Sequence, residues 1–165
     1  LGKVETLTAD FDMVTPGGVN QGKIFVDRDR KAIRIEFAPP MGHLVLVDGP
    51  VTKLYGDDGT RVRTATSGTP FALLMNPEQA LVDNIDVLQV QKQGENLVVA
   101  VAQRGKKSAG QIILQFRGQS AWRLIEWGMF DKNGGFTQTR LKNVRTNALL
   151  DDDLFRAPEE EQSPE

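Results

Sequence analysis

The chain has 165 residues, the length of one domain, and its 39% hydrophobic and 25% charged residues exclude global disorder. A net charge of −2 argues against a nucleic-acid-binding surface, and the absence of cysteine excludes disulfides, thiolate metal sites and thiol nucleophiles. Because His43 is the single histidine, a cluster of imidazole ligands is excluded as well, and we expect no metal and no cofactor.

The dominant pattern along the chain is an alternation of apolar and polar residues. It predicts half-buried strands over residues 7–13, 33–37 and 112–116. Residues 44–47 and 97–102 are apolar at consecutive positions, which is typical of strands covered on both faces. Turn signals at short intervals, such as Asn133-Gly134-Gly135, favour an antiparallel meander over β-α-β units.

Two short helices are predicted to interrupt this pattern. Thr69-Pro70 and Asn76-Pro77 each place a capping residue before a proline, which predicts helices over residues 70–75 and 77–83. Their apolar residues recur at helical spacing, so one face of each helix has to be covered. The helices either cap the sheet permanently or form a movable lid, and the pattern is compatible with both.

The predicted fold is mainly β with short helices (α+β). Roughly ten strands with one apolar face must hide that face by packing on a second sheet or by curling. One candidate is therefore a packed sandwich. The other is a strongly curled antiparallel sheet, an incomplete β-barrel closed by a short helical lid over an apolar cavity. The pattern alone is equally compatible with the two architectures.

The sequence contains no convincing catalytic motif. Residues 118–122 begin like a nucleophile elbow, but Trp122 stands where the second glycine is required. Gly105 and Gly110 have the spacing of a phosphate-binding loop, yet Gln111-Ile112 replaces the Lys-Ser or Lys-Thr pair of that loop. We therefore expect no catalytic residues and a protein that is not an enzyme.

The order of several motifs resembles the LolA family of periplasmic outer-membrane lipoprotein carriers. The motifs are Gln21-Gly22-Lys23-Ile24-Phe25-Val26-Asp27-Arg28, Ile33-Arg34-Ile35-Glu36-Phe37, Leu46-Val47-Asp48-Gly49, Thr69-Pro70-Phe71-Ala72-Leu73-Leu74, Ile112-Ile113-Leu114-Gln115-Phe116 and Asp131-Lys132-Asn133-Gly134-Gly135-Phe136-Thr137. The resemblance extends from residue 7 to residue 158. It implies an incomplete β-barrel that is closed by short helices and encloses an apolar cavity for acyl chains, without enzymatic activity.

The resemblance implies three groups of site residues. We expect the acyl-chain cavity to be lined by Phe11, Met13, Ile33, Ile35, Phe37, Leu114, Phe116 and Trp127. The lid would comprise Phe71, Leu74, Met75 and Leu81, and the first three would fill the cavity in the absence of cargo. In the family, an arginine at the end of the second strand bonds backbone groups of the lid. Arg28 matches that position, and Arg30 is the alternative because Asp29 stands where the family has proline.

The resemblance also implies a location and partners. The expected carrier is a periplasmic monomer that takes lipoproteins from an inner-membrane transporter and passes them to an outer-membrane receptor. Because the chain starts at Leu1 rather than Met, we expect that a segment such as a secretory signal has preceded it. Residues 1–158 would form the carrier domain and residues 159–165 an acidic disordered tail.

Two other readings remain open from the sequence. One is a lipoprotein-sensing module or an outer-membrane receptor domain on the same scaffold. The other is a hydrolase of a lipid or glycan, which is less favoured because no nucleophile, metal site or pair of carboxylates is visible in the sequence.

Overall fold

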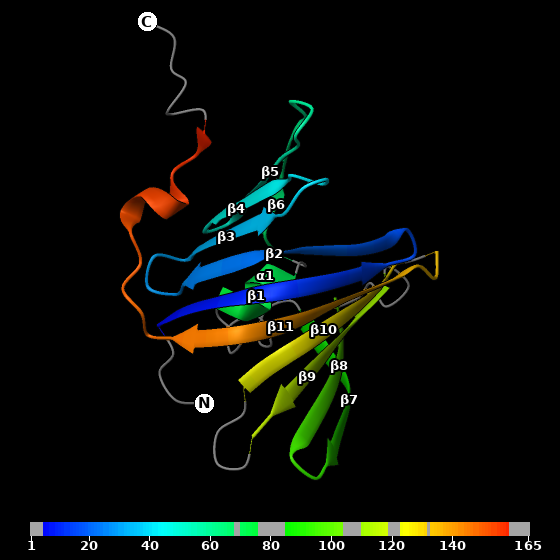
Figure 1. The fold of residues 1–165 in the computed structure, drawn as a ribbon. Coiled ribbons are helices and arrows are strands. Elements are labelled where there is room, and N and C mark those ends of the chain that lie inside the picture. Colours follow the sequence, from blue (N-terminus) through cyan, green and yellow to red (C-terminus); the bar gives the residue numbers. More distant parts are fainter. Residues whose placement is uncertain are drawn as a thin grey trace, which may run out of the picture.

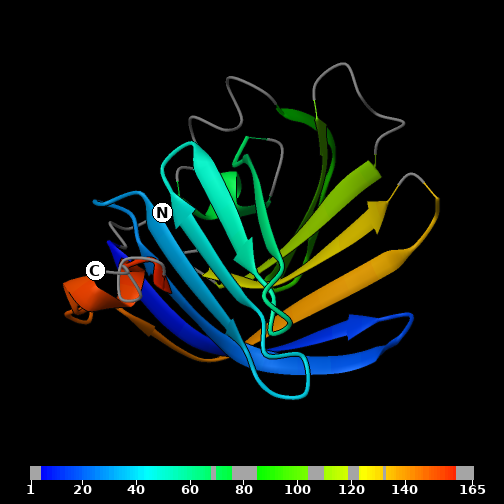
Figure 2. The same cartoon turned by 90° about the horizontal axis from the view of Figure 1, so that it is seen from above.

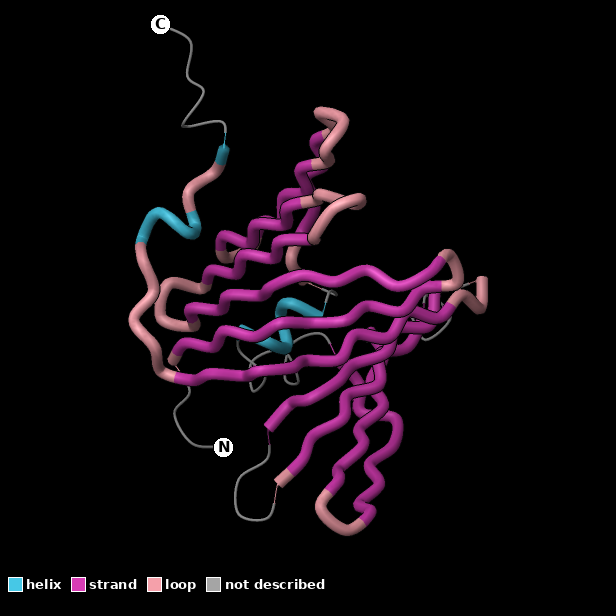
Figure 3. The backbone as a smooth tube through the Cα atoms, in the orientation of Figure 1, coloured by secondary structure: helices cyan, strands magenta, loops and turns pink. Residues whose placement is uncertain are grey.

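The computed structural model describes residues 5–67, 70–75, 85–103, 110–118, 123–131 and 133–158. In these residues eleven antiparallel strands form one sheet in the order β6-β5-β4-β3-β2-β1-β11-β10-β9-β8-β7 (Figure 1). The strands are β1 (Thr6–Thr15), β2 (Gly18–Asp27), β3 (Ala32–Phe37), β4 (Leu44–Asp48), β5 (Val51–Tyr55), β6 (Arg61–Ala65), β7 (Ile85–Gln93), β8 (Asn96–Gln103), β9 (Gly110–Arg117), β10 (Arg123–Asp131) and β11 (Phe136–Thr146). The prediction of a mainly β fold with little helix is confirmed (Figure 3).

The sheet is strongly curved but does not close, because β6 and β7 have no partner strand on their outer edges among the described residues. Seen from above, the strands curve around α1 (Pro70–Met75), which lies on their inner face (Figure 2). The two-sheet sandwich is therefore wrong, since all the described strands belong to one sheet. Two meanders, β1–β6 and β7–β11, make up this sheet and are joined by pairing between β1 and β11.

Irregularities in the strand pairing help to explain the curvature. Opposite the segment between Thr8 and Asp10 of β1, the strand β11 has one extra residue, and β10 has one between Leu124 and Glu126. A third extra residue lies between Val87 and Gln89 in β7. An extra residue in one strand of an antiparallel pair bends that strand and increases its twist. The curvature that covers the apolar face of the sheet is thus produced at these irregular positions. The apolar–polar alternation of the sequence does not mark them.

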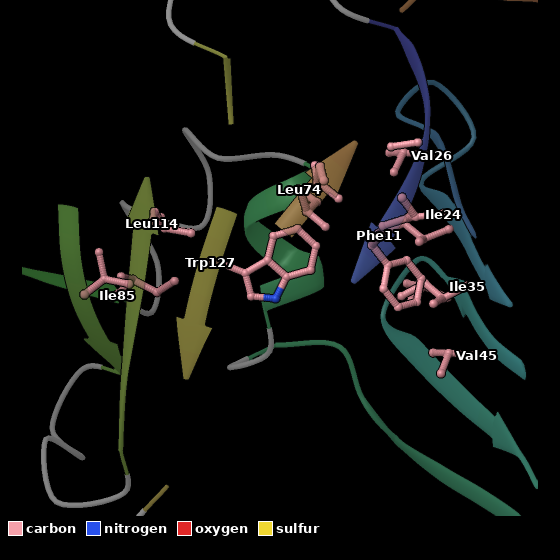
Figure 4. Packing of buried hydrophobic residues seen from close by; sticks show 14 residues of the cluster. Phe11, Ile24, Val26, Ile35, Val45, Leu74, Ile85, Leu114 and Trp127 are labelled. Atoms are coloured by element: carbon pink, nitrogen blue, oxygen red, sulfur yellow. The ribbon is translucent and has the colours of Figure 1, made fainter. Parts of the chain in front are cut away.

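The core lies on the concave face of the sheet. Its least exposed large side chains are Ile24, Ile33, Val26, Val47 and Val101, which come from strands of both meanders. Trp127 of β10 points toward Leu74 of α1, and Phe11 and Ile35 lie across from it (Figure 4). Burial of each such side chain contributes about 1.5–3 kcal/mol to stability. The apolar faces of the two meanders are therefore covered partly by each other and partly by α1.

The helix α1 occupies the residues for which the first helix was predicted. It contacts β2 and β3 from the concave side. Leu74 is buried, and Phe71, Ala72 and Met75 are partly buried against the core. The second predicted helix, residues 77–83, and its lid residue Leu81 lie outside the described residues, as does the predicted tail of residues 159–165.

The C-terminal segment crosses the opposite, convex face. Its 3₁₀ helix, η2 (Asp152–Phe155), packs on β3, where Arg34 Nη1 donates a hydrogen bond to the Leu154 carbonyl oxygen at 3.0 Å. Arg30 forms an ion pair with Asp152, and its guanidinium lies 5.9 Å from the centre of the Phe155 ring. These contacts fix η2 beside the turn between β2 and β3.

Candidate functional site: an apolar pocket on the concave face

A pocket of about 250 Å³ opens on the concave face of the sheet. Its lining comes from both meanders and from Phe71 of α1. Figure 4 shows Trp127 of one meander facing Phe11 and Ile35 of the other. The residues that line the pocket are apolar except for two threonines, and they are Phe11, Met13, Ile24, Ile35, Phe37, Phe71, Trp127, Met129, Thr137 and Thr139. Because Met129 is also 37% exposed, the pocket reaches the surface at the β10–β11 hairpin.

One wall of the pocket consists of two phenylalanine rings with a glycine between their strands. Phe11 lies opposite Gly22 in the β1–β2 pairing, and Gly22 lies opposite Phe37 in the β2–β3 pairing. The two rings meet edge to face with their centroids 5.3 Å apart. A Cβ atom on Gly22 would lie 2.6 Å from Phe11 Cζ, so the Phe11 ring occupies the space that a side chain would need. The glycine lets this ring lie flat on the sheet instead of projecting into the pocket.

A hydrogen bond joins α1 to the end of β2. Arg28 Nε donates to the carbonyl oxygen of Leu74 at 3.0 Å. This contact satisfies a carbonyl in the last turn of a helix, where no backbone partner is available within the helix. Burial lowers the pKa of Arg28, but a guanidinium remains charged at physiological pH. The bond is therefore charge-assisted and of the stronger kind.

Arg30, the alternative candidate for this role, points elsewhere. Its backbone N–H and its guanidinium contact Asp27, and the guanidinium also reaches Asp152 and Phe155 of the C-terminal segment. Arg28 and Arg30 thus project to opposite sides of the turn between β2 and β3. Of the two, Arg28 is the arginine bonded to α1 in the described chain.

The structure brings together most of the residues predicted for the cavity. Phe11, Met13, Ile35, Phe37 and Trp127 line the pocket, as does Phe71 of the predicted lid. Ile33 and Leu114 lie in the buried core cluster outside the lining, and Phe116 is partly buried against that cluster. Leu74 and Met75 also pack on the core.

Four lining residues were not predicted from the sequence: Ile24, Met129, Thr137 and Thr139. Ile24 and Met129 continue the alternation that contains Val26 and Trp127, so this pattern carried a signal for them. The threonines are polar, so the alternation of apolar residues gave no signal for them. The strand register places Thr139 opposite both Met13 and Trp127, and Thr137 opposite Met129.

The described part of the chain offers little for catalysis. It contains no group of three or more His, Asp or Glu side chains able to hold a metal ion. His43 lies at the entrance to β4, with its ring centroid 6.4 Å from that of Phe37. None of the helices in the described residues is long and apolar enough to cross a membrane. The only hydroxyl groups among the side chains that line the pocket in the described residues are those of Thr137 and Thr139.

A row of charged side chains lies on the convex face, behind the pocket. Lys142 Nζ lies 2.8 Å from one carboxylate oxygen of Asp12, and Gln21 donates a hydrogen bond to the other at 3.0 Å. Next to them, Arg140 Nε lies 3.0 Å from Glu126 Oε1. We call these five residues the ion-pair row.

The ion-pair row predicts a pH dependence of stability. Hydrogen bonds from Lys142 and Gln21 lower the pKa of Asp12 below its usual value of 3.8. A carboxyl group with a lowered pKa in the folded state stabilises the fold above its unfolded pKa, and this contribution is lost as the pH falls through the folded pKa. Asp12→Asn is therefore expected to lower Tm slightly at pH 7, with the difference shrinking below about pH 4.

Thermal melts of the parent and Asp12→Asn at pH 7 and pH 3 measure this effect. Asp29→Asn, at an exposed residue of the β2–β3 turn, is the control for removing an acidic charge. A loss of Tm that is equal at both pH values would contradict the assignment to ionised Asp12.

Comparison with known proteins bears on what the pocket binds. The family model for the outer membrane lipoprotein carrier protein LolA matches residues 2–158. The chain belongs to the LolA family. The resemblance identified in the motif order is thus confirmed, and it now covers nearly the whole chain.

Solved structures with the same fold are distant in sequence. An uncharacterised conserved protein from Thermus thermophilus has a TM-score of 0.56 at 12% identity, with 94% of this chain and 86% of that chain covered. A domain described as a putative outer membrane lipoprotein-sorting protein from Vibrio parahaemolyticus has a TM-score of 0.54 at 12% identity, with coverages of 93% and 90%. The MucA/MucB complex of Pseudomonas aeruginosa gives a TM-score of 0.53 at 12% identity, covering 94% of this chain and 56% of that chain. Curated proteins gave no match.

Membership of the LolA family supports a binding or carrier protein over an enzyme at the level of the family. It also supports lipoproteins or their lipids as the class of ligand, and an extracytoplasmic location.

Proposed function

We propose that this LolA-family chain is a periplasmic carrier that holds the acyl chains of lipoproteins in its apolar pocket. It would accept a lipoprotein from a transporter in the inner membrane and pass it to a receptor on the outer membrane. The observation that carries the proposal is the pocket itself, which is lined almost wholly by hydrocarbon and aromatic side chains in a family of lipoprotein carriers. Such a lining favours an unbranched hydrocarbon over a polar ligand.

The size of the pocket indicates that α1 has to move during loading. A volume of about 250 Å³ corresponds to roughly eight groups the size of a water molecule or a methylene, which is about half of one long acyl chain. A lipoprotein with two or three chains therefore needs more space than this pocket provides. Phe71 is the part of α1 that enters the pocket, so displacing the helix would enlarge it.

The contacts that α1 makes with the concave face in the empty protein also bear on how the cargo is released. Burying acyl methylenes contributes about 0.8 kcal/mol each, so two or three fully buried chains could hold the cargo too tightly to hand over. Contacts of Phe71, Leu74 and Met75 with the concave face stabilise the empty protein, and these contacts are lost when cargo enters. The net affinity is the difference between the two sets of contacts. In this scheme Arg28 sets the balance, because its bond to Leu74 exists only while α1 is in place.

The experiment that tests the proposal compares acylated and unacylated peptides. The delipidated protein should bind a triacylated lipopeptide and should not bind the same peptide without acyl chains, as measured by native mass spectrometry without vesicles. Met13→Glu places a carboxylate in the pocket lining, and we expect it to weaken binding at least tenfold, or about 1.4 kcal/mol. Val14→Glu is the matched control, because the next residue along β1 faces the opposite side of the sheet.

Equal binding of both peptides, or equal losses in the two variants, would argue against the pocket as the acyl site. Turnover of an ester substrate by the parent would favour the hydrolase instead. If the protein binds the lipopeptide but fails to release lipoproteins from spheroplasts, then the role in transfer is wrong and a sensing or receptor domain becomes the better account.

A further inference from the structure

The two hairpin ends at the mouth of the pocket expose apolar side chains. We call them the apolar rim, and they are Val14 (46% exposed), Val19 (63%), Met129 (37%), Phe130 (40%) and Phe136 (36%). They lie at the ends of β1, β2, β10 and β11, whose two hairpins lie side by side (Figure 1). Large apolar side chains grouped at one end of a protein mark an interaction surface more often than scattered ones do.

The rim extends over both hairpins. Val14 pairs with Val19, and on its other side Val14 lies opposite Gln138, which is two residues from Phe136. The Phe136 and Phe130 rings stack with centroids 4.5 Å apart. These four side chains share the convex face, whereas Met129 lies on the concave face and lines the pocket. The rim is therefore apolar on both faces of the sheet. A medium that surrounds the hairpin ends would cover such a rim better than a partner that contacts only one face.

The positions of the charged side chains limit how deeply the apolar rim can enter an apolar medium. Residues 13–22, which include the β1–β2 turn, carry no charged side chain. Asp131 in the other hairpin accepts hydrogen bonds from the backbone N–H groups of Asn133 and Gly135, both at 2.8 Å, and Lys132 lies outside the described residues. On the convex face, charges begin with the ion-pair row at Asp12. That residue is two positions behind Val14, or about 7 Å along the strand.

We propose that the apolar rim inserts into the interfacial layer of a bilayer of zwitterionic lipids. On the β1–β2 hairpin, the distance of about 7 Å from Val14 to the first charge at Asp12 agrees with the depth of about 5–10 Å to which apolar protein surfaces enter this layer. On the other hairpin, the exposed carboxylate of Asp131 keeps its hydrogen bonds with two backbone N–H groups. The ion-pair row would then lie among the headgroups. Each of its two cations is paired with a carboxylate, so the row has no net charge that would require anionic headgroups. Insertion would bring the mouth of the pocket, at Met129, to the level of the acyl chains.

Vesicle flotation tests this proposal without any pocket ligand. The parent protein is expected to co-float with vesicles of phosphatidylcholine and phosphatidylethanolamine and to remain bound at high salt, because the contact is apolar and salt does not screen it. Val19→Asp places a charge in the rim and should lower the bound fraction about tenfold. Val90→Asp is the control, since Val90 is a comparably exposed strand valine (59%) in the edge strand β7.

Three results would overturn the proposal: no flotation of the parent, equal loss in both variants, or binding that requires anionic lipid and disappears at high salt. Binding only to vesicles that contain a membrane protein would show that the rim serves a protein partner instead. The proposed acyl binding is independent of this outcome. Val19→Asp should still bind the triacylated lipopeptide in the absence of vesicles, so failure of the rim and failure of the pocket are distinguishable.

Discussion

Replacing Gly22 with alanine is expected to lower the free energy of unfolding by about 3 kcal/mol, at the upper end of the usual cost of overpacking. The new Cβ atom would clash with the Glu36 carbonyl oxygen and would lie 2.6 Å from Phe11 Cζ. The first contact is with backbone, so the β2–β3 pairing has to shift, and the second pushes the Phe11 ring toward the pocket. A drop in Tm of roughly 6–12 °C in a thermal melt is the expected result.

Two further variants separate these causes. Gly17→Ala should have little effect, because its nearest neighbour, Thr15 Oγ1, would be 3.7 Å away. Phe11→Leu combined with Gly22→Ala should cost less than the sum of the single changes, since the smaller side chain relieves one of the two clashes. A change of less than about 1 kcal/mol for Gly22→Ala, or strict additivity in the double variant, would show that Phe11 does not rest on Gly22 as described.

Replacing Arg28 with leucine is expected to loosen α1 while the sheet stays intact. The variant loses a charge-assisted hydrogen bond to the Leu74 carbonyl oxygen, a loss of about 1.5–3 kcal/mol. Amide hydrogen exchange in residues 72–75 should then become about ten to a hundred times faster, because exchange there follows local opening. In the proposed carrier, loading with a triacylated lipopeptide should rise and transfer to a receptor should slow down.

Arg30→Leu provides the matched control for this prediction. It removes an arginine from the same turn, but the contacts of Arg30 are with Asp27, Asp152 and Phe155 and not with α1. Exchange in residues 72–75 should therefore match that of the parent protein. If both variants behave alike, the effect belongs to the turn and not to the bond. If exchange in the parent protein is the same with and without lipopeptide, α1 is not a lid.

Local chemistry allowed several elements to be predicted. Residues 33–37 and 112–116 lie in β3 and β9, because their alternation matches the two faces of a strand that is buried on one side. The proline after Thr69 marked the start of α1, because proline is favoured at the first position of a helix. In contrast, β6 has no buried side chain, so no apolar alternation signals it, and its place in the sheet depends on backbone pairing with β5.

The pocket depends on features that are not local. The bulges in β7, β10 and β11 curl the sheet, and the apolar–polar alternation does not mark their positions. Thr137 and Thr139 enter the lining through the register of β11 with β1 and β10, although their side chains are polar. Ile33 has the same alternation as Ile35 but lies in the closed part of the core. Alternation thus identified the apolar face of the strands that it predicted, while strand register and curvature decide which part of that face remains open.

The pairing of β1 with β11 has a consequence for the order in which the chain acquires its structure. Each meander consists of neighbouring hairpins with short loop closures, whereas Leu7 pairs with Thr146, near the other end of the chain. Contacts between residues so far apart in sequence form late, because the entropy of closing the loop has to be overcome first. Phe11 and Ile35 belong to one meander, and Trp127 and Met129 to the other. The pocket therefore cannot exist until the last strand has been synthesised and has reached the first, so that a growing chain has no place in which to capture a lipid too early.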